Sequence, residues 1–137
     1  MANWLFKEEP DHYSLDDLFR DKRAVWDGVE NNLALKHLRS VKKGDRAFYY
    51  HTGNEKSVVG VMEIVKGPYP DPNGDDPRFV VVDVKPVRCL ARPVSPAEIK
   101  SNPKFADFAL VRISRLSVMP VTDAQWAEIE RLSKQGA

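Results

Sequence analysis

This chain of 137 residues lacks the features that would place it in a membrane or in a disulfide-bonded secreted class. Its single cysteine, Cys89, excludes an internal disulfide, so we expect a reducing, cytoplasmic setting. No apolar run approaches the roughly 18 residues that cross a bilayer, and no basic segment precedes a long apolar one near Met1. We therefore expect neither a membrane span nor a signal peptide.

The sequence also lacks the motifs of metal and enzyme chemistry. Its three histidines stand apart, without the close His or Cys pairing of zinc sites. Neither a Gly-x-Gly-x-x-Gly fingerprint nor a Walker A loop is present, so no phosphate cradle for nucleotides is predicted. Cys89 lies in a strand-like stretch, where a buried, inert thiol is usual and the neighbouring Arg88 points to the other face. We expect no enzyme, no cofactor and no metal.

The length and the alternating patterns predict one α+β domain over residues 1–137. Helices are predicted to open at Ser14, after Asn31-Asn32 and as far as Gly44, at Ser95 and at Thr122. Strands are predicted over residues 4–7, 45–51, 57–66 and 78–87, with one or two more within 111–121. About five or six strands with helices inserted between them favour a small, partly closed barrel, which avoids exposed edges.

The residues between 25 and 60 carry the strongest indication of a binding site. Trp26 precedes the turn signal Asp27-Gly28, which places it near a rim at a strand end. In the strand Phe48-Tyr49-Tyr50-His51 alternate side chains share a face, so one pair is expected in the core and the other is available. The sequence does not decide which pair is which.

These residue types suit a flat, polar ligand such as a nucleobase. Bases are held by stacking on aromatic side chains, with amides and hydroxyls reading the hydrogen-bonding edge. Trp26, Tyr50, Asn31 and Thr52 have the side chains that such a pocket needs. Tyr49 and Trp126 are interpreted as core residues. For His51 two readings stay open, a structural histidine and a direct ligand contact.

The net charge is only +1, so the field of the whole molecule does not attract nucleic acid. Any affinity for nucleic acid has to come from a local cluster of cations, and one is present. The cluster consists of Lys36, Arg39, Lys42, Lys43 and Arg46, with Asp45 as its one acid. It can be a solvated helix face followed by a turn, or a patch that faces phosphates.

Several motifs occur together in the order found in one known family. They are Trp4-Leu5-Phe6-Lys7-Glu8-Glu9-Pro10, Val25-Trp26-Asp27-Gly28-Val29, Gly44-Asp45-Arg46-Ala47-Phe48-Tyr49-Tyr50-His51, Val59-Gly60-Val61, Ala109-Leu110-Val111-Arg112 and Arg115-Leu116-Ser117-Val118-Met119-Pro120-Val121. The chain resembles EVE-domain proteins over nearly its full length. This resemblance implies a single PUA-like mixed β pseudobarrel, related to the YTH and ASCH domains.

The resemblance also implies a function, a non-enzymatic pocket for a modified base, most often a modified cytosine, flipped out of DNA. By position, Trp26 would form an aromatic wall, Tyr50, His51 and Thr52 would line the cavity, and Asn31 would read an edge. Lys7 and Arg112 would lie nearby, in phosphate-binding or structural roles. Any effector protein is expected to be a separate chain.

The sequence departs from the family after Trp-Asp-Gly-Val. Many members continue with Arg-Asn-Tyr-Gln-Ala-Arg-Asn, whereas this chain has Glu30-Asn31-Asn32-Leu33-Ala34-Leu35-Lys36. Glu30, Leu33 and Leu35 remove polar groups, so the ligand is expected to differ from that of typical members.

The leading interpretation is therefore a reader of a modified base in DNA. The alternative is an RNA-binding PUA-like module that acts on structured or modified RNA. A small enzyme that uses Cys89 or His51 is disfavoured, because no nucleophile, base and acid can be placed together.

Overall fold

A computed structural model describes residues 2–135 of the chain. Its strands are β1 (Asn3–Glu8), β2 (Ala24–Trp26), β3 (Arg46–His51), β4 (Ser57–Pro70), β5 (Val80–Val94) and β6 (Val118–Val121). Its helices are α1 (Leu15–Asp21), α2 (Asn32–Ser40), α3 (Pro96–Lys100), α4 (Ala109–Arg112) and α5 (Asp123–Ser133), with a 3-10 turn η1 (Pro103–Phe105). Helices and strands interleave along the chain, as the sequence predicts for an α+β domain.

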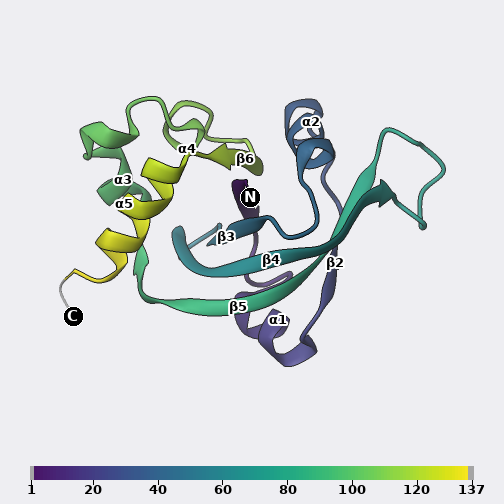
Figure 1. The fold of residues 1–137 in the computed structure, drawn as a ribbon, viewed down its shortest axis with the longest axis horizontal. Coiled ribbons are helices and arrows are strands. Elements are labelled where there is room, and N and C mark those ends of the chain that lie inside the picture. Colours follow the sequence, from purple (N-terminus) through teal and green to yellow (C-terminus); the bar gives the residue numbers. More distant parts are fainter. Residues whose placement is uncertain (1, 136–137) are drawn as a thin grey trace.

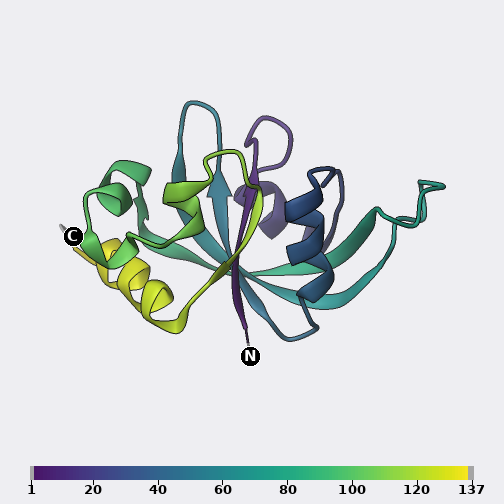
Figure 2. The ribbon, with the colours of Figure 1, turned by 90° about the horizontal axis from the view of Figure 1, so that it is seen from above.

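The strands form one strongly curved sheet in the order β2-β5-β4-β3-β1-β6 (Figure 1). β1 runs parallel to β3, and the remaining pairs are antiparallel. The parallel register aligns Glu8 with His51, so the chain leaves β1 and β3 at the same edge of the sheet. Figure 2 shows the loops after these two strands together at one end of the molecule, away from the N-terminus. This edge is where the candidate site forms.

The predicted helix starts are confirmed by side-chain caps. Ser14, Asn31, Ser95 and Thr122 each accept a hydrogen bond from a backbone N–H in the first turn of the helix that follows. Three of these caps, all except Asn31, are reciprocal capping boxes. The local sequence therefore supplies a cap for each of these helix starts.

The predicted end of the second helix at Gly44 is wrong, because α2 ends at Ser40. At this point the buried carboxylate of Asp45, and not a helical carbonyl, accepts the backbone hydrogen bond. Its oxygens accept hydrogen bonds from the backbone N–H of Lys42 at 2.9 Å and from the indole N–H of Trp4 at 3.0 Å. A charged acceptor inside the protein must be satisfied, so residues 41–45 form a turn around it instead of another helical turn.

The reading of residues 111–121 as strand is correct in part. β6 covers Val118–Val121, whereas Ala109–Arg112 form the short helix α4. Phe105 and Phe108 are fully buried, with ring centroids 5.6 Å apart. Their spacing of three residues suits helical turns and not a strand, and α4 continues that winding. β4 and β5 extend beyond the predicted ends at residues 66 and 87, as bulged register shifts carry their pairing onward.

The expectation that one face of β3 stays available is also wrong. Phe48, Tyr49, Tyr50 and His51 are all less than a tenth exposed, because the curved sheet is covered on both faces. Trp126 of α5 stacks on Phe48 at 3.7 Å between ring centroids. The core assignment of Tyr49 is thereby confirmed, whereas Trp126 is only partly buried and packs against the core from outside.

Cys89 departs from its expected burial, since the structure leaves it exposed on β5. It pairs with Gly60 of β4. The side chain borders an open hollow next to His51 and not the core.

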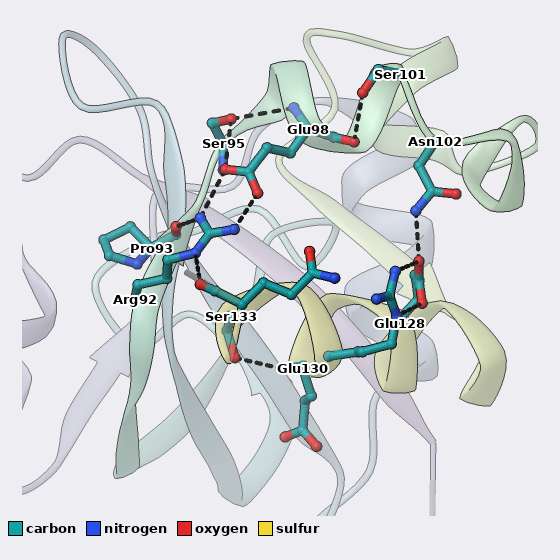
Figure 3. A network of polar contacts seen from close by, with 11 residues as sticks. Arg92, Pro93, Ser95, Glu98, Ser101, Asn102, Glu128, Glu130 and Ser133 are labelled. Carbon is teal, nitrogen blue, oxygen red and sulfur yellow. Dashed lines mark hydrogen bonds and ion pairs between the residues drawn. The ribbon is translucent and has the colours of Figure 1, made fainter. Parts of the chain in front are cut away.

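Two ion-paired networks fasten α5 and its neighbours at one end of the sheet (Figure 3). In the first, Arg92 pairs with Glu98 of α3 at 2.7 Å. In the second, Glu128 of α5 accepts hydrogen bonds from Arg131 Nε at 2.7 Å and from Asn102 Nδ2 at 2.6 Å. The hydrogen bond from Arg131 is the largest cause that lowers the pKa of Glu128, to about 2, against the opposing effect of burial. These contacts stabilise the helical layer formed by α3 and α5.

Candidate functional site

Trp26, the last residue of β2, is held by aromatic neighbours. Its ring lies 5.5 Å from that of Phe6 and 5.2 Å from that of Tyr49, the latter edge to face at 82°. Such tilted pairs add about 0.5–1.5 kcal/mol to simple burial and fix the orientation of a ring. Only 4% of Trp26 is exposed. The indole is therefore a fixed wall and not a mobile surface group.

A cavity of about 490 Å³ opens beside this wall; we call it the Trp26 cavity. It is lined by Lys7, Glu8, Glu9, Trp26, Asp27, Gly28, Val29, Thr52, Ser114, Arg115 and Ser117. These residues come from the ends of β1, β2 and β3 and from the segment before β6. The volume falls in the range of small-molecule sites, about 300–1,000 Å³. A smaller hollow of about 120 Å³ adjoins Trp26 on the side of Tyr13.

Backbone hydrogen bonds hold the segments of the cavity together. Thr52 N–H donates to the carbonyl of Glu8 at 3.0 Å, and Lys7 N–H donates to the carbonyl of Ser117 at 2.9 Å. Gly28 has a φ of 77°, a left-handed conformation that glycine adopts without strain, and this turns the chain from β2 toward the cavity.

Carboxylates and hydroxyls give the Trp26 cavity its polar character. The hydroxyl of Thr52 donates to Glu9 Oε2 at 3.2 Å, and Glu8 Oε1 lies 3.2 Å from His12 Nδ1. Gly53 has a φ of 74°, and a Cβ there would stand 2.7 Å from Glu9 Oε1. Glycine at this position lets the Glu9 carboxylate approach the loop after β3. The cavity thus offers several fixed hydrogen-bond acceptors.

The two buried tryptophans of the N-terminal half use their polar atoms differently. The N–H of Trp4 donates to Asp45, whereas the N–H of Trp26 has no acceptor among residues 2–135. No buried side-chain nitrogen or oxygen in that part of the chain lacks a partner, so the Trp26 N–H keeps some accessible surface toward the hollows that adjoin the ring. An unused donor in a cavity wall is suited to a polar ligand.

Tyr50 borders a second, adjacent cavity of about 220 Å³, which we call the lysine cavity. Its lining comprises Lys7, Tyr50, Thr52, Gly53, Lys56, Pro96, Lys100, Leu110 and Ser114. Lys7 Nζ lies 5.4 Å from the centroid of the Tyr50 ring, within the range of a cation–π contact. Burial raises the pKa of the Tyr50 hydroxyl.

His51 lies away from both of these cavities. Its Nε2 accepts a hydrogen bond from the backbone N–H of Leu15 at 3.1 Å, and its Nδ1 lies 2.5 Å from Glu55 Oε2. These partners assign the proton to Nδ1 and occupy both ring nitrogens. The hollow that His51 shares with Cys89, of about 510 Å³, therefore offers no free imidazole nitrogen to activate the thiol.

Asn31 has a structural role at the start of α2. Its side-chain oxygen accepts a hydrogen bond from Ala34 N–H at 3.0 Å, and the residue lines none of the cavities described above. The replacements at Glu30, Leu33 and Leu35 do not line them either, and Leu35 belongs to the core. The departure from the family sequence therefore lies just before and on α2 and not in the wall of the Trp26 cavity.

The cations predicted from their spacing lie apart from the Trp26 cavity. Lys36, Arg39, Lys42 and Lys43 are all exposed, and so is Arg112, which the family resemblance and not the spacing had indicated. Lys42 and Lys43 precede β3, whose first residue pairs with Asn3, so they lie at the opposite end of β1 and β3 from Glu8. Arg39 donates to the carbonyl of Arg78 at 2.5 Å, near the β4–β5 hairpin.

The structure thus brings together three of the residues proposed from sequence, Trp26, Thr52 and Lys7, with Tyr50 in the adjoining cavity. It adds residues that the sequence reasoning missed: Glu8, Glu9, Asp27, Ser114 and Arg115. A pair of acids directly after a predicted strand is a signal for the first two. Nothing in the local sequence signals the last two, because only the pairing of β6 with β1 brings their segment to the site.

Residues 2–135 show neither a cluster of metal ligands nor a helix that could span a membrane. Within this range no group of three or more His, Cys, Asp or Glu side chains is arranged to hold a metal ion. The helices of the same range are all too short or too polar to cross a membrane.

Comparison with known proteins shows where this fold occurs. The model of the EVE domain family matches residues 2–132. Human thymocyte nuclear protein 1 is 31% identical over 159 residues, covering 91% of this chain and 71% of that protein. The NMR structure of Rpa0253 from Rhodopseudomonas palustris is 40% identical, with a TM-score of 0.92 and coverage of 100% of this chain and 96% of that one.

A further solved structure contains a ligand. The crystal structure of the human THYN1 protein in complex with 5-methylcytosine-containing DNA has a TM-score of 0.91 and 29% identity, and the match covers 100% of both chains. These matches confirm the α+β, PUA-like pseudobarrel that the resemblance implied.

Proposed function

The chain belongs to the EVE domain family, and we propose that it is a non-enzymatic nucleic-acid-binding module that recognises a modified base, a modified cytosine in DNA, in the Trp26 cavity. The observation that carries the proposal is the rigid Trp26 wall beside an open polar cavity at the edge of the sheet. The likeness to a protein solved with 5-methylcytosine-containing DNA supports it.

The chemistry of the lining suits a cytosine. Unpairing and flipping a base cost a few kcal/mol, which contacts in the pocket must recover. Stacking of a base on an aromatic face is worth about 1–3 kcal/mol, which sets an upper range for contact with the exposed part of Trp26. The carboxylates of Glu8, Glu9 and Asp27 are acceptors for the exocyclic amino group of cytosine, and the Trp26 N–H is a donor for a base carbonyl or ring nitrogen. The cavity can therefore recognise both an amino group and an acceptor on one flat ligand.

Binding without catalysis is supported by the state of the reactive side chains. Nucleophilic catalysis needs a base beside the nucleophile, and the nitrogens of His51 are both engaged by Leu15 and Glu55. Cys89 lies on the rim of that separate hollow and not in the Trp26 cavity. The groups that line the Trp26 cavity serve recognition.

The test is an equilibrium titration of the wild-type protein with duplexes of one sequence that carry cytosine, 5-methylcytosine or 5-hydroxymethylcytosine at one position. We expect one modified duplex to bind more tightly than the unmodified one, by a factor that salt does not change. An RNA of the same sequence is the competitor. Equal binding of all three duplexes would refute the proposal, and stronger competition by RNA would favour the RNA-binding alternative.

A further inference from the structure

The lysine cavity has a charge unlike that of its neighbour. Lys7, Lys56 and Lys100 all line it, and its lining contains no carboxylate. The Trp26 cavity, in contrast, contains three acids among its lining residues. Among residues 2–135 none of the three lysines forms an ion pair with an acid. The lysine cavity therefore concentrates positive charge that the protein itself does not neutralise.

Lys7 shows the effect of this concentration most clearly. It is half-buried, and its Nζ donates to the carbonyl of Ser114 at 2.9 Å. Burial, and then the charge of Lys100, lower the pKa of Lys7. An anion in the cavity would relieve both penalties, because it would supply the missing opposite charge.

The two cavities share part of their walls. Lys7, Thr52 and Ser114 line both of them, so the two spaces are separated by no more than these side chains. A nucleotide whose base occupies one cavity carries its own phosphate within reach of the other. Lysine ammonium groups and hydroxyls are the usual partners of backbone phosphates.

We infer that the lysine cavity is a phosphate subsite, in which Lys56 and Lys100, together with Lys7, bind a backbone phosphate next to the base held in the Trp26 cavity. This inference rests on the proposed function, which it extends by assigning the backbone contact. The backbone phosphate is thereby assigned to lysines other than Lys42 and Lys43, which lie at the other end of β1 and β3. Sequence clustering alone would have selected those two residues.

The first test compares two matched double variants, Lys56→Gln with Lys100→Gln and Lys42→Gln with Lys43→Gln. All four side chains are exposed, and each variant removes two positive charges. We expect the first variant to weaken binding of modified and unmodified duplexes by the same factor. It should also reduce the slope of log K against log salt by about 1, as expected for loss of one neutralised phosphate.

The control variant should retain both the affinity and the salt slope of the wild type. An unchanged slope for the Lys56, Lys100 variant would overturn the inference, as would a slope loss confined to the Lys42, Lys43 variant. Thermal melts of both variants establish that they remain folded.

The second test neutralises the phosphate instead of the protein. Duplexes receive a single uncharged methylphosphonate at each linkage that flanks the modified base. We expect one position to weaken wild-type binding and to cause no further loss in the Lys56, Lys100 variant. Fully additive losses would show that this phosphate contacts other residues and would overturn the inference.

These outcomes separate the subsite from the proposed function. If the wild type failed to distinguish modified from unmodified cytosine, the base-reading proposal would fail. The salt slopes and the methylphosphonate series would still report whether the lysine cavity binds a phosphate. Conversely, retained base preference with no effect in either series would refute the subsite alone.

Discussion

Replacement of Trp26 separates its contribution to folding from its contribution to binding. The ring is 4% exposed and contacts Phe6 and Tyr49, so Trp26→Ala leaves a void between these aromatic side chains. Truncation of a buried aromatic residue to alanine costs about 3–5 kcal/mol. Because domains are typically stable by about 5–15 kcal/mol, the alanine variant would be close to unfolding. Trp26→Phe keeps a ring in place and should cost about 1–3 kcal/mol.

The effect on binding follows from loss of the wall and of the indole N–H. Contact of a base with an aromatic side chain is worth about 1–3 kcal/mol, so the dissociation constant for the preferred duplex should rise about 5- to 150-fold in Trp26→Ala. We expect Trp26→Phe to lie between this variant and the wild type. The preference for the modified base should fall in the same order.

The assay pairs urea unfolding with fluorescence anisotropy of a labelled duplex, in conditions where each variant is folded. Trp126→Ala is the matched control, because Trp126 packs on Phe48 and lies outside the Trp26 cavity. It should lose stability and keep the wild-type dissociation constant. A folded Trp26→Phe or Trp26→Ala protein with unchanged affinity and base preference would refute the reasoning.

Two further substitutions test structural roles. Asn31→Ala should cost about 1 kcal/mol in thermal or urea unfolding through loss of the α2 cap, whereas Asn31→Asp keeps the cap. Neither should change the affinity for DNA, and a binding defect in folded Asn31→Asp would show that its amide reads the base. Glu128→Gln should destabilise the protein by about 1–3 kcal/mol at pH 7, because it weakens hydrogen bonds to charged partners. The lowered pKa of Glu128 stabilises the protein above about pH 4.5, so this difference in unfolding free energy should shrink as the pH falls toward about 2; a difference that is constant with pH would contradict this role.

Local signals predicted the parts of the fold that depend on adjacent residues. Ser14, Ser95 and Thr122 cap their helices through groups three residues away, and such pairs are visible in the sequence. The end of α2 was mispredicted because Asp45, which accepts a hydrogen bond from Lys42 N–H, is also bonded in the interior by Trp4, 41 residues away along the chain. Long-range competition of this kind leaves no periodic pattern.

For the site as well, residues marked by their neighbours in the sequence were predicted, and residues brought in by strand pairing were not. Trp26 was identified from its turn and Thr52 from its residue type, and the family resemblance indicated Lys7. Ser114 and Arg115 reach the cavity only through the pairing of β6 with β1, and the spacing of the cations gave no indication that Lys42 and Lys43 would face away from it. Motif order therefore predicted the family and its pseudobarrel, whereas the walls of the cavity required the three-dimensional structure.

The most direct test of the central claim is the indole N–H region of the ¹H–¹⁵N NMR spectrum, recorded while a duplex with 5-methylcytosine is added. The account predicts that the Trp26 signal shifts strongly on saturation, because the indole lines the Trp26 cavity and its N–H has no acceptor among residues 2–135. The Trp4 signal should stay in place, because its N–H is bonded to Asp45. Binding of the duplex with the Trp26 signal unmoved would contradict the claim that the base enters this cavity.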